Sequence, residues 1–209
     1  MKRMHQSKTR PRGGANAFQA NGLLIVLTTL FISGLVVGAL CVRTAEGEVL
    51  GKMTQLFQNY TQIRAQQSMF QNFSNSFIAG AIGILLLYLF GLTAWGAPLI
   101  LCIPTFEGMG IGMASGTLYA DYGWPGFGYS ALIIVPGALI SAIAILLSAR
   151  ESIRYSADIF LENCLLHTPH HQPFKNYSIK FLILLLLVAV AATIDMLTIQ
   201  FFAKLFPLF

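Results

Sequence analysis

The sequence predicts an all-α membrane protein: a bundle of five transmembrane helices plus one extracytoplasmic amphipathic helix. Composition is the first reason, because 56% of the 209 residues are hydrophobic and only 10% are charged. Soluble domains carry about 25% charged residues. The second reason is that the apolar residues gather in five runs of about 20 residues, the length that crosses a hydrocarbon core. A chain this poor in charge is neither a soluble globular enzyme nor a disordered protein.

The five runs are separated by short polar segments, and the first follows a basic tail. That first run is predicted to stay as an uncleaved span, since it is long for a signal peptide and no Ala-x-Ala site closes it. Pro98 opens the third run and Pro136 lies inside the fourth. The predicted order is a cytoplasmic tail (1–21), a span (22–41), an extracytoplasmic segment (42–76), spans at 77–95, 98–119 and 129–149, a cytoplasmic loop (150–179) and a last span (180–202), all in one membrane domain, 22–209.

Lysine and arginine are distributed unevenly between the two sides of this topology. The tail holds five and the segment 150–180 holds four, whereas the other side holds the remaining four of thirteen. The positive-inside rule therefore predicts a cytoplasmic N-terminus and an extracytoplasmic C-terminus. The turn around Gly96 is so short that spans two and three could instead form a re-entrant pair.

The segment 46–73 predicts an amphipathic helix of about seven turns, because its apolar residues between 49 and 70 recur at steps of three and four. Its opposite face is rich in Thr, Gln and Asn, with little positive charge. Two readings are open: the apolar face packs on the spans, or it docks a partner outside the membrane. The partner-contact candidates are Val49, Met53, Leu56, Phe57, Tyr60, Ile63 and Phe70.

Two acidic residues fall inside predicted spans, Glu107 and Asp195. An acid at that depth is costly and normally faces protein or water. The pair could serve a proton or cation path, or it could fix helix packing through hydrogen bonds. Beside Glu107, the glycines Gly108, Gly112 and Gly116 recur every four residues and predict a smooth ridge for close helix packing, within the bundle or in a homo-oligomer.

No catalytic or cofactor-binding motif occurs in the chain, so the sequence predicts a protein that is not an enzyme and needs no cofactor. Cys164, His167, His170 and His171 group potential metal ligands, but their spacing matches no strong zinc motif and no metal site is predicted. Nucleic acid is not an expected partner, because the basic excess is better explained by lipid headgroups.

Residues from about Phe73 to Ala157 resemble the stage II sporulation protein M family. The resemblance begins in the span FQNFSNSFIAGAIGILLLYLFG and continues through the turn Gly91-Leu-Thr-Ala-Trp-Gly-Ala-Pro98. Three further stretches carry it: Glu107-Gly-Met-Gly-Ile-Gly112, Asp121-Tyr-Gly-Trp-Pro-Gly126, and Leu132-Ile-Ile-Val-Pro136. Glu107 stands where the family often has a basic or amide residue.

The resemblance implies a bacterial cell-membrane scaffold for endospore engulfment. It implies that the scaffold anchors stage II sporulation proteins D and P, which degrade peptidoglycan, and is not itself the hydrolase. The alternative is a small transporter or permease subunit that uses Glu107 and Asp195 within glycine- and proline-interrupted spans. An intramembrane protease using Asp121 and Asp195 is disfavoured, because Asp121 lies in a loop and no Gly-x-Gly-Asp motif is present.

Overall fold

The computed structural model describes residues 13–164 and 174–202. Within these residues there is no strand, and five helices are long and apolar enough to cross a membrane, which confirms the predicted class. The elements are α1 (Gly13–Thr44), α2 (Gly47–Gln66), α3 (Met69–Gly91), α4 (Ala97–Tyr122), α5 (Trp124–Tyr129), a π-helix η1 (Ser130–Ile134), α6 (Val135–Cys164) and α7 (Phe174–Phe202).

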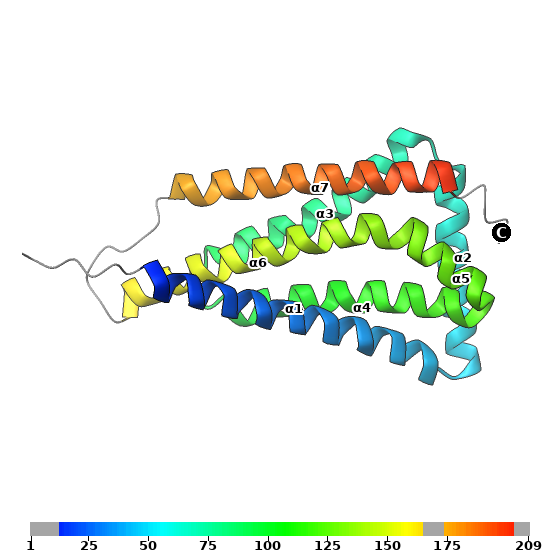
Figure 1. The fold of residues 1–209 in the computed structure, drawn as a ribbon, viewed down its shortest axis with the longest axis horizontal. Coiled ribbons are helices and arrows are strands. Elements are labelled where there is room, and N and C mark those ends of the chain that lie inside the picture. Colours follow the sequence, from blue (N-terminus) through cyan, green and yellow to red (C-terminus); the bar gives the residue numbers. More distant parts are fainter. Residues whose placement is uncertain (1–12, 165–173, 203–209) are drawn as a thin grey trace, which may run out of the picture.

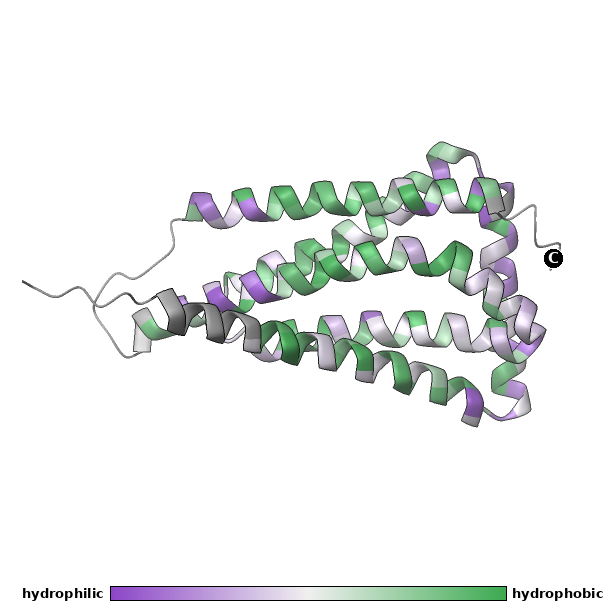
Figure 2. Cartoon of the chain, viewed as in Figure 1, coloured by the Kyte–Doolittle hydropathy of each residue, from purple (hydrophilic) through white to green (hydrophobic). Residues whose placement is uncertain are grey.

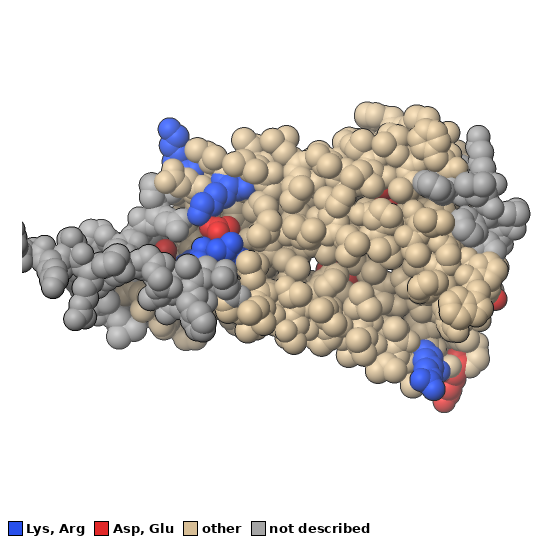
Figure 3. All heavy atoms as spheres, viewed as in Figure 1, with Lys and Arg blue, Asp and Glu red and all other residues tan. Residues whose placement is uncertain are grey.

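The long helices run side by side, and α2 crosses them at one end of the bundle (Figure 1). We call this the α2 end. At the other end, α3 and α6 finish and α7 begins, and we call it the closed end. Hydrophobic residues fill the middle of each long helix, whereas hydrophilic residues lie toward the two ends and along α2 (Figure 2). The visible charged side chains gather in the same two places (Figure 3).

Helices α1 and α4 form a closely packed pair. A Cβ atom added to Gly108 or Gly112 of α4 would stand 2.2 or 2.1 Å from a backbone oxygen of α1, that of Phe31 or Leu35. Gly34 of α1 meets the backbone of α4 in the same way, since its Cβ would stand 2.2 Å from the oxygen of Thr105. Only glycine allows the two backbones to come this close. Such close packing stabilises helix pairs in a bilayer, where the hydrophobic effect contributes little to helix association.

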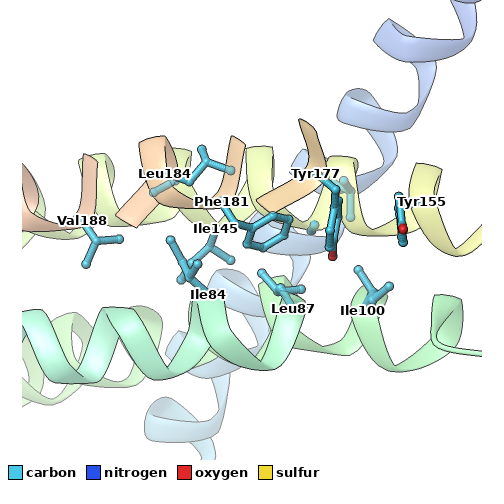
Figure 4. Close-up of a cluster of buried hydrophobic side chains, with 12 residues drawn as sticks. Ile84, Leu87, Ile100, Ile145, Tyr155, Tyr177, Phe181, Leu184 and Val188 are labelled. Atoms are coloured by element: carbon cyan, nitrogen blue, oxygen red, sulfur yellow. The ribbon is translucent and has the colours of Figure 1, made fainter. Parts of the chain in front are cut away.

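The main core cluster joins α3, α6 and α7 and is densest near the closed end (Figure 4). The Tyr177 ring stacks on Tyr88 and Tyr155, with centroid distances of 5.1 and 4.1 Å. The Tyr177 hydroxyl donates to the backbone oxygen of Tyr88 at 2.9 Å, and Ser152 donates to that of Leu87 at 2.7 Å. These bonds tie α6 and α7 to the backbone of α3 near its C-terminal end, where the carbonyl groups begin to lack donors within the helix.

The predicted amphipathic helix over 46–73 is wrong in its extent, because α2 ends at Gln66 and α3 begins at Met69. A capping box separates them: the Ser68 hydroxyl accepts from the Gln71 amide nitrogen, and the Gln71 side chain accepts from the Ser68 N–H. The span predicted at 77–95 therefore starts eight residues earlier. It also ends earlier, at Gly91, and a turn over 92–96 leads into α4.

The span predicted at 129–149 is also too short, because α5, η1 and α6 form one apolar helical segment from Trp124 onward. The connection from α4 is Gly123 alone, whose φ of 60° suits glycine. Pro136 has no N–H to donate. In the turn just before it, the Val135 N–H donates to the backbone oxygen of Ser130, five residues earlier. This spacing is that of a π-helix.

Three other predicted segments also change. The cytoplasmic loop predicted at 150–179 is helical at 150–164 and 174–179, and residues 165–173 lie outside the described part of the chain. The last helix accordingly begins at Phe174 and not at 180. Helices α3 and α4 have 23 and 26 residues, so each is long enough to cross a membrane, which favours two full spans over a re-entrant pair.

Candidate functional site

An ion pair fastens α2 to the bundle. Arg64, in the last turn of α2, donates from Nη2 to Oδ2 of Asp195 in α7 at 2.6 Å. The Ser76 hydroxyl of α3 bridges the pair, accepting from Arg64 and donating to Asp195. The side chains of Arg64 and Asp195 are only 14% and 17% exposed, so water screens the pair weakly. Three helices that are remote in sequence meet at this point.

The basic partner of Asp195 is not evident from the sequence, in which Arg64 lies in the predicted extracytoplasmic segment 42–76. The available signal was its helical position, because Arg64 lies one residue after Ile63 and four after Tyr60, on the apolar side of α2. Its guanidinium also lies 5.3 Å from the Tyr60 ring centroid, a cation–π distance.

Polar contacts make the other attachments of α2. Thr54 donates to Asp121 near the end of α4, at 3.0 Å, and Gln58 donates to the hydroxyl of Tyr122 at the same distance. Asn72 of α3 donates to the backbone oxygen of Arg64 at 2.8 Å. Helix α2 is thus tied to α3, α4 and α7 by side-chain hydrogen bonds and one ion pair.

The apolar residues of α2 are only partly covered by the bundle. Met53 and Phe57 are half-buried against it. The other four predicted partner-contact residues within α2 are between 53% and 69% exposed, and they form one flank of the helix. Phe70 is also exposed but belongs to α3. We call the exposed flank the α2 stripe, and it consists of Val49, Leu56, Tyr60 and Ile63.

Glu107 lies within α4, ten residues after Ala97 and fifteen before Tyr122. It lines two cavities of about 240 and 260 Å³, and Asp195 and Arg64 line both of them as well. The structure therefore brings the two predicted intramembrane acids to one site. Glu107 forms no hydrogen bond or ion pair with any other described residue. The two acids consequently differ: Asp195 has a cationic partner and Glu107 has none.

The glycine ridge lies on the other side of α4 from the cavities. Gly108 and Gly112 contact the backbone of α1, and a Cβ on Gly116 would stand 3.4 Å from Ala39 and Val42. In this structure the ridge is used inside the bundle. Of the Cys164–His171 group, the three histidines lie outside the described residues. The described part of the chain holds no cluster of three metal-ligating side chains.

Five long apolar helices, with charged side chains meeting between them, are the fold of a multi-pass membrane protein. Its family follows from comparison with known proteins. The family model for stage II sporulation protein M matches residues 27–199, which is most of the chain. The chain belongs to this family, as the sequence resemblance indicated. No curated protein and no solved structure was found to match it.

Proposed function

We propose that this protein is a non-catalytic scaffold in the bacterial cell membrane during endospore engulfment. In this role it holds peptidoglycan-degrading enzymes, expected to be stage II sporulation proteins D and P, at the engulfing membrane. Family membership supports a place in sporulation. The protein supplies an anchor and a docking surface, and the enzymes supply the chemistry.

The observation that carries this proposal is the α2 stripe. An amphipathic helix normally buries its apolar face on its own protein. Here the helix is fastened by polar bonds, while Val49, Leu56, Tyr60 and Ile63 remain exposed. Helix α2 crosses the end of the bundle, so a partner outside the membrane could reach it (Figure 1). Partner surfaces are often built from such aromatic and aliphatic anchors.

The proposed orientation places the α2 end outside the cytoplasm. Among the described residues, Arg150 and Arg154 lie in the second half of α6 and Lys175 and Lys180 in the first turns of α7, toward the closed end, where α6 finishes and α7 begins (Figure 1). Basic residues favour the cytoplasmic side. The α2 stripe would then face the space between the two septal membranes, where cell-wall enzymes work.

The direct test is co-purification of protein D or P with the double variant Leu56→Asp, Ile63→Asp. Both side chains are exposed, so two carboxylates there should leave membrane insertion unchanged and abolish co-purification. The matched control is Gln55→Asp, Gln62→Asp, which adds the same charge to exposed positions on the polar face of the same helix. Equal recovery of the partner with both double variants would refute docking on the α2 stripe.

The cellular test is deletion of the gene in a sporulating host, followed by imaging of stained membranes under starvation. A septum that bulges or fails to migrate supports the engulfment role. Normal engulfment in the deletion strain would overturn it. Complementation with the Leu56→Asp, Ile63→Asp variant then connects the phenotype to the surface, since the control double variant should restore engulfment.

A further inference from the structure

The bundle is hollow toward the α2 end. The cavities of about 240 and 260 Å³ share Tyr60, Arg64, Glu107, Ile134 and Asp195 in their linings, so they adjoin. Together they fall in the range of about 300–1,000 Å³ that is usual for small-molecule sites. Side chains of α2 form part of both linings. Figure 3 shows the surface opened between α4 and α6, where the two helices lie apart in Figure 1.

The charges of this space do not balance. Arg64 is neutralised by Asp195, whose carboxylate lies 2.6 Å away. No other Lys, Arg or His lines either cavity among the described residues. Glu107 is therefore the one acid of this lining without a cationic partner, and ionising a carboxyl group there without a partner is costly. A positively charged group entering the cavities would remove that cost.

The lining identifies the kind of cation. A metal ion of the Na⁺ or Ca²⁺ type needs about six oxygen ligands. Besides Glu107, the described linings offer the Asp195 carboxylate and hydroxyl groups from Tyr60, Thr61, Ser76, Tyr129 and Ser141. Asp195 and Ser76 are already engaged with Arg64, so few oxygen ligands remain for a metal ion. The larger cavity is lined mostly by apolar side chains, which suit an apolar body. They are Phe57, Phe106, Ile111, Ala114, Ile133, Ile134 and Ile199.

We propose that these adjoining cavities bind a small organic cation, with its positive group at Glu107 and its apolar part against Phe57, Phe106 and Ile133. This site shares only Tyr60 with the α2 stripe and goes beyond the proposed scaffold role. Tyr60 and Phe106 lie close enough to the lining to add cation–π attraction. Arg64 positions Asp195 and limits the net charge of the site to one.

Tight packing at the closed end blocks access to the cavities from that end. Beyond the cavities, α3, α6 and α7 are packed by the core cluster that includes Ile84, Ile145 and Phe181 (Figure 4). No cavity-lining residue belongs to the tyrosine stack near the closed end. A ligand thus enters at the α2 end, or through the opening between α4 and α6, and its positive group binds at Glu107.

The test uses two probes with the same tail and opposite charge, hexyltrimethylammonium and hexane-1-sulfonate. The full-length protein is placed in nanodiscs of zwitterionic lipid and titrated by calorimetry, with empty nanodiscs subtracted. We expect saturable binding of the ammonium probe at one site per chain and no saturable binding of the sulfonate. Glu107→Gln should weaken ammonium binding by at least about ten-fold. Glu48→Gln, which removes an exposed acid on α2, should leave it unchanged.

A second variant keeps the test decisive if Glu107→Gln does not fold. Ala114→Phe fills the apolar cavity while retaining the acid, and it should weaken ammonium binding by a similar factor. Three results would overturn the proposal: no saturable ammonium binding to the unmodified protein, equal binding of the two probes, or unchanged binding in both folded variants. Equal binding of the probes would indicate a cavity that merely takes lipid tails.

Discussion

The two ends of the bundle are built differently. At the closed end, α3, α6 and α7 are joined by stacked tyrosines and by serines that cap the backbone of α3. Near the α2 end the helices separate, cavities remain between them, and an ion pair with a bridging serine connects them. The closed end is held by close side-chain contact, and the α2 end by a crossing helix attached through an ion pair and hydrogen bonds.

The difference between the two ends follows from the weakness of the hydrophobic effect between helices in lipid. Helices in a bilayer gain little from hiding apolar surface on one another, so close approach needs small residues and hydrogen bonds. On α6, Ser148, Ser152 and Ser156 recur every four residues and are fully buried, and Gly91 of α3 meets Ser152. Near the α2 end, Glu107 and the larger side chains of the lining occupy the interface instead. Small residues such as Gly110 and Ala114 are also present in that lining, but a space remains between the helices.

The largest effect should come from breaking the fastener at the α2 end. Arg64→Met leaves Asp195 without its cation, and loss of one partner of a buried pair costs about 3–5 kcal/mol. The matched control is Lys52→Met, which breaks an exposed pair with Glu48 and should cost below about 0.5 kcal/mol. Unfolding titrations with SDS, starting from a mild non-ionic detergent, measure both.

The double variant Arg64→Met, Asp195→Asn sharpens this prediction. It removes the stranded charge, so it should be more stable than Arg64→Met alone. Equal losses for Arg64→Met and Lys52→Met would show that the pair contributes no more than a surface contact.

Overpacking the closed end should have the next largest effect. A Cβ on Gly91 would stand 2.1 Å from the Tyr177 hydroxyl and 3.0 Å from the Ser152 backbone. Gly91→Ala should therefore cost about 2–3 kcal/mol. Gly83→Ala, on the same helix, would meet only the end of Ile145 at 3.7 Å and should be nearly neutral. Similar stabilities of the two variants would argue against tight packing at this end.

Removing one hydroxyl at the closed end should have a smaller effect. Tyr177→Phe keeps the ring stack but deletes the bond to the Tyr88 carbonyl, so we expect a loss of about 1 kcal/mol. Tyr119→Phe alters an exposed ring in an edge-to-face contact with Trp124 and should change stability little. The same SDS titrations compare the two, and an unchanged midpoint for Tyr177→Phe would contradict the capping role.

The smallest effect should come from the outer tether of α2. Thr54→Val removes the exposed hydrogen bond to Asp121 and should cost about 0.5 kcal/mol or less. It should nevertheless speed amide hydrogen exchange in α2 more than in α3, because local opening of α2 is the event that this bond opposes. Equal changes in the two helices would mean that α2 opens only with the whole bundle.

The sequence was sufficient to predict the five helices, because apolar runs of this length have few other uses. It also contained a signal for the boundary between α2 and α3, because Ser68 and Gln71 have the spacing of a capping box. The periodic pattern of apolar residues continues to Phe70, however, and indicated one continuous helix. The extension of α6 past residue 149 was hidden by Arg150, Glu151 and Arg154, which look like a loop. In the structure Glu151 pairs with Lys180 of α7, at 2.6 Å, so the charges belong to helices.

The candidate site was predictable only in part. Glu107 and Asp195 were evident as acids within apolar runs. Their different surroundings were not evident, because the partner of Asp195 is 131 residues away in the chain. Likewise, periodicity identified the apolar face of α2 but could not divide it into Met53 and Phe57 on the bundle and the exposed α2 stripe. Such pairings depend on tertiary packing, which a single sequence does not contain.

The same separation gives the protein an order of assembly. During synthesis Arg64 leaves the ribosome long before Asp195, which lies in the last helix. Until α7 has been inserted, α2 lacks its main fastener and Ser76 lacks its acceptor. A chain truncated before α7 would therefore carry an α2 without this attachment and an unpaired arginine. The ion pair can form only after α7 has joined the bundle, so it is among the last contacts of the fold to be made.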